Sequence, residues 1–157
     1  MKRGKELLHY RQCGLDNVWL AGGWRVEDTE YGGGLVVENA DRLHRAIARA
    51  IAQGPRPLRG QDARFLRVML DLSQEALAGL LGVDRATVIR WEKARKRRLS
   101  RMQDIALRAT YAARAGAEFL PAATVLELQR SGERGSAAPA RAVFQSRAKD
   151  WREKKAA

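Results

Sequence analysis

Cysteine is almost absent from this chain, which has Cys13 alone among 157 residues. A single thiol excludes an intrachain disulfide and is typical of proteins in a reducing compartment. It also excludes a zinc site built from two Cys-x-x-Cys pairs. His9, His44 and Cys13 do not supply a tetrahedral set at the usual close spacing. We therefore expect neither a metal nor another cofactor.

Long apolar runs are also missing. No stretch approaches the ~20 residues that a membrane-spanning helix needs, and the chain does not open with the pattern of a signal peptide. We expect a cytoplasmic, nucleoid-associated protein without a membrane partner. The sequence also has no group of His, Asp and Ser residues, and no pair of carboxylates, at the spacing of a catalytic site. The sequence therefore favours a binding protein over an enzyme.

Acidic residues are too few to balance the basic ones. The chain has 18 Asp and Glu against 30 Lys and Arg, which gives a formal net charge of +12. Such an excess favours polyanions, because phosphates neutralised by Lys and Arg release their counterions. One dense basic run stands at residues 95–98. That run is either a solvated loop or a phosphate contact, and its place directly after a short predicted helix favours phosphate.

Residues 73–93 predict two short helices joined by a glycine turn. Ser73 is placed to N-cap the first helix, in which apolar residues recur at helical spacing. Gly82 ends that helix, because glycine adopts the left-handed conformation at little cost. Asp84 is placed to N-cap the second helix. The pattern predicts a helix-turn-helix, whose second helix has the size and charge to enter a major groove.

This spacing resembles the Cro/repressor-type (XRE-like) family of helix-turn-helix regulators. The residues that carry the resemblance are Gln74, Leu77, Ala78, Gly82, Val83, Val88, Trp91 and Glu92. A compact helical bundle that does not bind DNA is the alternative, since short motifs produce false positives.

The resemblance implies roles for individual residues. The residues expected to face base edges are Arg85, Ala86 and Arg90. Arg90 is the best placed of them, because a guanidinium matches the two acceptors of guanine, although arginine contacts phosphates as often. Phosphate contacts are expected from Gln74, Thr87, Lys93, Arg95 and Lys96. Thr87 has a competing role as a cap of its own helix.

Residues 1–54 predict a small β-rich module that ends in a helix. Short β-rich runs between residues 10 and 39 are separated by glycine clusters and indicate a hairpin or a three-stranded meander. Such a sheet needs a helix against one face, which residues 41–53 supply. The apolar residues expected to hold the module together are Leu15, Val18, Leu20, Trp24 and Val36. Residues 54–57 then predict a stiff linker.

Residues 58–116 predict the helix-turn-helix domain, of the five-helix type. Its first helix should bury Phe65 and Leu66 and leave Arg64 and Arg67 outside. Residues 99–112 predict a further helix, which either closes the bundle or carries a dimer seam. The expected fold class is therefore mainly α with a small N-terminal β element (α+β).

The last segment, residues 117–157, is expected to contain a helix near residues 121–130 and then a flexible basic tail. Phe144 and Trp151 stand in this tail. Large aromatic side chains there either anchor the tail to the body of the protein or dock a partner.

The larger arrangement resembles the MqsA/YgiT-type antitoxins over about residues 58–111. The residues that carry this resemblance are Pro57-Leu58, Phe65-Leu66-Arg67, Leu72-Ser73-Gln74, Gly82-Val83-Asp84 and Arg90-Trp91-Glu92-Lys93. It implies a homodimer that represses its own operator and binds a ribonuclease-like toxin through the N-terminal module. The zinc-binding cysteines of that family are missing here.

The sequence thus predicts a sequence-specific transcriptional repressor that binds double-stranded DNA at an inverted-repeat operator as a homodimer, and that acts as the antitoxin of a type II toxin–antitoxin system. Two alternatives stay open. One is a stand-alone helix-turn-helix regulator without a toxin partner. The other is a basic RNA- or ribosome-associated module that uses its charge alone.

Overall fold

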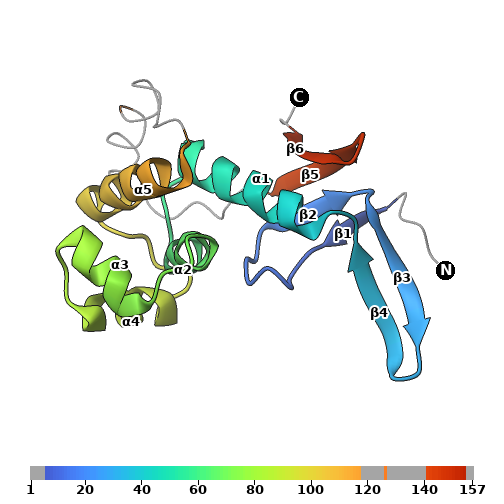
Figure 1. Cartoon of the computed structure of the whole chain (residues 1–157), viewed down its shortest axis with the longest axis horizontal. Helices are drawn as coiled ribbons and strands as arrows, with labels where there is room; N and C mark the ends of the chain where they lie inside the picture. Colours follow the sequence, from blue (N-terminus) through green and yellow to red (C-terminus); the bar gives the residue numbers. More distant parts are fainter. Residues whose placement is uncertain (1–5, 118–125, 127–140, 155–157) are drawn as a thin grey trace. The chain divides into compact units, whose positions relative to one another are not determined.

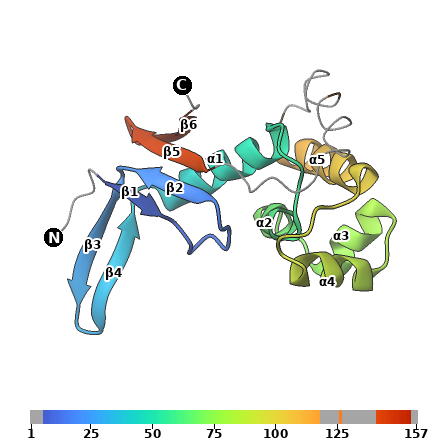
Figure 2. The ribbon, with the colours of Figure 1, turned by 180° about the vertical axis from the view of Figure 1, so that it is seen from behind.

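The fold is mixed α+β, the class that the sequence predicts, with four strands followed by five helices and two further strands among the described residues. The computed structural model describes residues 6–117, 126 and 141–154 (Figures 1 and 2). Its strands are β1 (Leu7–His9), β2 (Val18–Ala21), β3 (Trp24–Thr29), β4 (Gly32–Val37), β5 (Ala142–Arg147) and β6 (Asp150–Lys154). Its helices are α1 (Ala40–Gln53), α2 (Gly60–Met69), α3 (Gln74–Leu81), α4 (Arg85–Lys93) and α5 (Arg101–Ala115).

The chain divides into two compact units. Residues 1–47 and 139–157 make the first, called here the sheet unit, and residues 48–138 make the second, the helical unit. The division falls inside α1. The sequence predicted it at residues 54–57 instead, and this prediction is wrong because that segment is bonded into the helical unit, as described below.

The sheet unit contains a four-stranded sheet in the order β1-β2-β5-β6. β2 pairs parallel with β5, and the other pairs are antiparallel. Residues 142–154 are therefore sheet strands and not the flexible tail that the sequence predicted. This segment is ordered because β5 pairs with strands on both sides, β2 and β6, and its residues Ala142 and Phe144 are buried in the core. The helix predicted near residues 121–130 lies outside the described residues, apart from residue 126.

The core of the sheet unit lies between the sheet and the first half of α1. Val18 and Leu20 on β2 and Phe144 on β5 are buried toward Leu43 and Ile47 of α1. Trp151 is buried on the same side, and its indole nitrogen donates to the backbone oxygen of Glu38 at 2.7 Å. Phe144 and Trp151 are thus anchors. Of the apolar residues expected in this module, Leu15, Val18 and Leu20 are buried, while Trp24 and Val36 are half-buried.

The predicted hairpin is present as β3 and β4, which pair only with each other among the described strands. The three-stranded meander is not, because β2 belongs to the other sheet. Gly23 joins the two sheets. A Cβ there would lie 2.6 Å from the Trp151 ring, so only glycine fits between the hairpin and that side chain.

The helical unit packs α2, α3, α4 and α5 around Leu58, Leu66, Leu77, Val88 and Leu107. Ser100 is the N-cap of α5, and its hydroxyl accepts from the backbone nitrogen of Gln103 in a capping box. The contacts of α5 with α3 close the bundle. Of the two roles that the sequence allows for this helix, closing the bundle or carrying a dimer seam, the structure shows the first.

Residues 54–57 are tied to α5 by a buried arginine. Arg108 is 1% exposed and pairs with Asp104. Its guanidinium donates to the backbone oxygens of Ile51, Ala52, Gly54 and Arg56, and Asp104 accepts from the backbone nitrogen of Leu58. These bonds satisfy carbonyls at the end of α1, which is why the segment belongs to the helical unit and does not act as a free linker.

The described part of the chain has no helix long and apolar enough to cross a membrane. Within the same residues, no three His, Cys, Asp or Glu side chains gather where they could hold a metal ion. His9, His44 and Cys13 have separate partners. They bond to the backbone oxygen of Asp16, to the Tyr10 hydroxyl and to the backbone oxygen of Tyr10, respectively.

Candidate nucleic-acid interface

The turn between α3 and α4 has the geometry that the sequence predicts. The Ser73 hydroxyl accepts from the backbone nitrogen of Ala76 at 3.0 Å and caps α3. Gly82 has φ 65°, the left-handed conformation that ends the helix. The backbone nitrogen of Val83 then bonds back to the oxygen of Ala78. Asp84 occupies the N-cap position of α4, although its side chain accepts no capping hydrogen bond.

α4 presents one face to the core and another to solvent. Val88 is buried against the rest of the bundle, and Trp91 is half-buried. The three residues expected to face bases, Arg85, Ala86 and Arg90, are all exposed. The helix therefore offers two guanidinium groups and one methyl group on an open surface.

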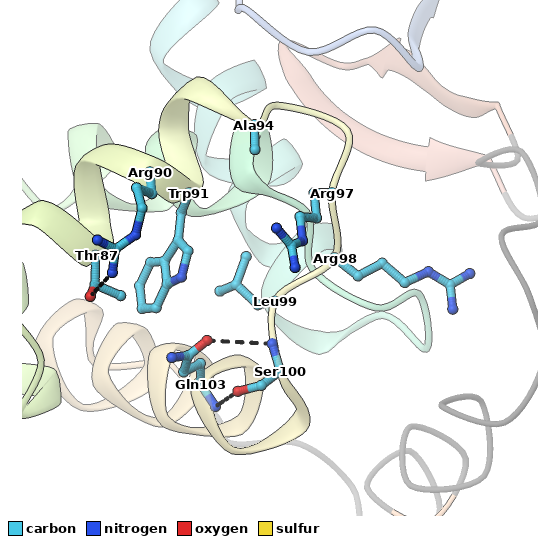
Figure 3. Close-up of a pocket in the computed structure, with 9 residues that line it drawn as sticks. All are labelled: Thr87, Arg90, Trp91, Ala94, Arg97, Arg98, Leu99, Ser100 and Gln103. Atoms are coloured by element: carbon cyan, nitrogen blue, oxygen red, sulfur yellow. Dashed lines mark hydrogen bonds between the residues drawn. The ribbon is translucent and has the colours of Figure 1, made fainter.

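Arg90 is held in place by its own helix. Its Nη2 donates to Thr87 Oγ1 at 2.8 Å (Figure 3). Thr87 thus accepts from Arg90 and does not cap α4. Because the two residues are three apart, the bond lays the guanidinium along the helix toward its N-terminus. It leaves further donors of Arg90 for a base edge or a phosphate.

The residues expected at phosphates fall into two groups. Lys93, Arg95 and Lys96 are exposed at the end of α4 and in the loop that follows. Gln74 opens α3 and is half-buried, and its Nε2 donates to Glu92 at 2.9 Å. The three cations extend the basic surface of α4, whereas the Gln74 amide is bonded within the protein.

Glu92 joins three helices through its carboxylate. Arg67 of α2 donates to both of its oxygens, at 2.6 and 3.1 Å, and Gln74 of α3 donates to one of them. Burial alone would raise the pKa of Glu92, but the hydrogen bonds from Arg67 and Gln74 and the nearby positive charge outweigh it and lower that pKa. The sequence predicts that Arg67 lies on the outside of the helix, and this prediction is wrong. The Arg67 side chain is largely buried and fixes α4 to α2.

The basic loop after α4 is fixed by backbone bonds. Gly60 donates to the oxygen of Arg97 and Gln61 to that of Arg95, both at 3.0 Å, and Leu99 donates to Leu58 at 2.9 Å. The start of α2 lies very close to the end of α4, because a Cβ on Gly60 would lie 1.8 Å from the backbone oxygen of Trp91. The run at residues 95–98 is thus a positioned loop, and its cations have defined places beside α4.

This loop, the end of α4 and the start of α5 enclose a hollow of about 390 Å³. Its lining residues are Thr87, Arg90, Trp91, Ala94, Arg97, Arg98, Leu99, Ser100 and Gln103 (Figure 3). Trp91 and Leu99 form an apolar wall, and Arg90 and Arg97 stand on either side of it, while Arg98 points away. Among the described residues, no acidic side chain lines the hollow. Its chemistry suits a group with both an apolar part and negative charge.

Sequence reasoning did not assign Arg97, Arg98 and Gln103 to the interface. The run at residues 95–98 indicates phosphate contact, and the sequence predicts it for Arg95 and Lys96, but neither residue lines the hollow. Which side chains of the run point toward the hollow depends on which of its backbone oxygens bond to α2. The sequence alone carries no sign of that choice.

Two exposed arginines on a short helix, set by a glycine turn and flanked by a fixed basic loop, define a helix-turn-helix DNA-binding domain. Residues 64–106 match the model of a family described as helix-turn-helix. The comparisons with curated proteins and with solved structures found no match. The chain therefore contains a Cro/XRE-type helix-turn-helix domain, and with it the DNA-binding element of a transcription regulator.

Proposed function

We propose that the protein is a sequence-specific repressor that binds an inverted-repeat operator as a homodimer. The observation that carries this proposal is the open face of α4, where Arg85, Ala86 and Arg90 are exposed next to a fixed basic loop. Two copies related by a two-fold axis would place their α4 helices in successive major grooves. The half-sites would then lie about one helical turn, roughly 34 Å, apart. Such binding would associate the protein with the nucleoid.

In this proposal Arg90 contacts guanine and Ala86 a thymine methyl group. Arg85, Thr87, Lys93, Arg95, Lys96 and Gln74 contact phosphates or lie beside them. The hollow beside α4 takes a sugar and its phosphate, because its wall of Trp91 and Leu99 is apolar and Arg90 and Arg97 flank it. The groups of one nucleotide would then explain both the apolar and the cationic lining.

We further propose that the protein is the antitoxin of a type II toxin–antitoxin system and that the sheet unit binds a ribonuclease-like toxin. Two features support this. The helical unit resembles that of the MqsA/YgiT-type antitoxins, and the sheet unit is a separate compact body that could carry a second binding function. The protein would act by binding and not by catalysis. Both histidines are already engaged in structural contacts.

The first experiment measures operator binding. A gel-shift titration uses the DNA upstream of the gene, with scrambled duplex as competitor at physiological salt. Arg90→Ala should reduce the preference for the operator by about tenfold or more, while salt-sensitive binding to any duplex remains. Arg114→Ala, which removes an exposed arginine at the far end of α5, is the matched control. An unchanged preference in Arg90→Ala would show that this residue does not contact bases.

A second experiment addresses the toxin. The protein is co-expressed with the product of the adjacent gene, and the complex is purified through a tag on that product. Co-elution at a fixed ratio supports the antitoxin role. If the adjacent product has no ribonuclease activity and does not bind, the protein is a regulator without a toxin partner.

A further inference from the structure

The four-stranded sheet has a second face that the first half of α1 does not cover. Side chains alternate along β2 and β5, so that Val18, Leu20 and Phe144 turn toward α1. The paired residues Trp19 and Val143 turn the other way. Figure 2 shows this side of β1, β2 and β5 in front of α1. Within the described residues of the sheet unit, 6–47 and 141–154, no other helix or strand lies over it (Figure 2), and Leu7 on this face is 49% exposed.

A stack of three planar groups crosses this face. The rings of His9 and Trp19 lie 4.4 Å apart and nearly parallel. The guanidinium of Arg141 lies 4.5 Å from the centre of the Trp19 ring. Arg11 donates from its Nε to His9 Nδ1, which holds the imidazole in place. The stack is therefore preorganised, and the exposed Arg141 keeps in-plane N–H donors that a stacked guanidinium can direct at a ligand.

Positive charge surrounds the stack. Arg152 and Lys154 on β6 pair with Gln145 and Val143, and paired residues share a face of the sheet. The cations on or beside this face are Arg11, Arg141, Arg147, Arg152 and Lys154, all exposed, and the register places one carboxylate, that of Asp150, with them. We name this surface the open sheet face and define it by His9, Trp19, Val143, Gln145 and these cations.

We propose that the open sheet face binds single-stranded RNA. An excess of cations over carboxylates fits a phosphate backbone. Planar groups held in a stack can be extended by an unpaired base, either on Arg141 or on His9. A duplex cannot do this, because its bases are already stacked inside. An acidic peptide would satisfy the charges and leave the stack unused. The Gln145 amide, which both donates and accepts, suits the 2′-hydroxyl that distinguishes RNA from DNA.

This site would be separate from α4. Operator binding measured in the same preparations therefore distinguishes its failure from a failure of the proposed repressor function. If the chain binds RNA but no operator, only the proposed repressor function is wrong. If it binds the operator but no RNA, only the proposed RNA site is wrong.

The test uses the full chain and fluorescence anisotropy with a labelled, unstructured oligouridylate at physiological salt. Arg152→Ala/Lys154→Ala should weaken binding by about tenfold and flatten the salt dependence by about 1.4 in log–log slope, since each contact to a single strand contributes about 0.7. Arg45→Ala/Arg49→Ala is the matched control, because it removes two exposed arginines from α1. Arg141→Lys keeps the charge, loses the planar group and should weaken binding by about fivefold.

Each other result overturns the proposal. Equal losses in the two double variants would show attraction by net charge alone. Equal affinity for oligodeoxythymidylate would assign the face to single strands of DNA. Tight binding of polyglutamate that Arg152→Ala/Lys154→Ala abolishes would assign it to an acidic protein. Loss of RNA binding in Arg90→Ala, with the sheet variants unaffected, would place the RNA on α4. Thermal melting of every variant confirms that the sheet unit is folded.

Discussion

At the scale of single residues, the interface depends on a carboxylate that does not face the DNA. Glu92 lies within α4, between exposed Arg90 and exposed Lys93, yet it points inward and accepts from Arg67 and Gln74. The cations of α4 can therefore remain on the outer surface without a neutralising partner. A negative charge inside the bundle fixes the helix, and the positive charges outside it are left for phosphates.

This arrangement predicts a pH dependence of stability. The pKa of Glu92 is lower in the folded chain than its ordinary value of 4.5. The carboxylate therefore contributes stability that is complete above about pH 4.5 and is lost as the pH falls through the lowered pKa. Glu92→Gln should lower the free energy of unfolding by about 2 kcal/mol at neutral pH and remove this part of the acid dependence. Urea titrations of the helical unit from neutral to acidic pH measure both effects.

The exposed Glu75 on α3 provides the control. Glu75→Gln removes the same charge from the helix-turn-helix and should leave the free energy of unfolding within about 0.5 kcal/mol of that of the parent chain. If the two variants respond alike to acid, Glu92 does not hold the three helices together.

At the scale of helices and strands, what could be predicted from the sequence is what depends on neighbours along the chain. The cap at Ser73, the end at Gly82 and the short helix between them follow from capping and periodicity, and the structure confirms each of them. The roles of Arg67 and Arg108 do not follow, because Glu92 and the carbonyls between residues 51 and 56 that accept from them belong to other parts of the chain. Both arginines sit at positions that periodicity alone would assign to solvent or leave undecided. The hollow beside α4 was likewise not predictable, since backbone bonds between the loop and α2 create it.

The packing of α2 on α4 predicts a severe effect of a very small substitution. A methyl group on Gly60 would collide with the backbone oxygens of Trp91 and Ala94, which cannot move as a flexible side chain could. Gly60→Ala should therefore destabilise the helical unit by more than about 3 kcal/mol and abolish operator binding. Circular dichroism during heating and the gel-shift titration measure the two losses.

The matched control for this substitution is Gly79→Ala. Gly79 lies within α3, and a Cβ there meets nothing within 4 Å. Alanine costs less backbone entropy in a helix, so this variant should be more stable by about 0.5–1 kcal/mol. A destabilised Gly79→Ala would mean that the surface of α3 is covered by a partner.

At the scale of the whole molecule, the sequence predicts two modules but not the extent of the first, because that unit is not continuous in sequence. β5 lies beside β2, more than a hundred positions away along the chain, and the pairing is parallel. Short-range patterns carry no information about such a pair. The alternation in β5 and β6 is also weak, since their outward residues include Val143 and their inward ones include Ser146. Composition alone therefore made this segment look like a tail.

Two independent units predict two separable losses of structure. Phe144 is 1% exposed in the sheet unit, and Leu107 is fully buried in the helical unit. Phe144→Ala should destabilise its unit by about 3–5 kcal/mol, and Leu107→Ala should cost its own unit about 2–5 kcal/mol. Hydrogen exchange of the full chain should then accelerate in residues 6–47 and 141–154 for the first variant, and in residues 48–117 for the second. If either substitution accelerates exchange equally throughout, the units unfold as one. Phe144→Ala would then also reduce operator binding, which separate units would leave intact.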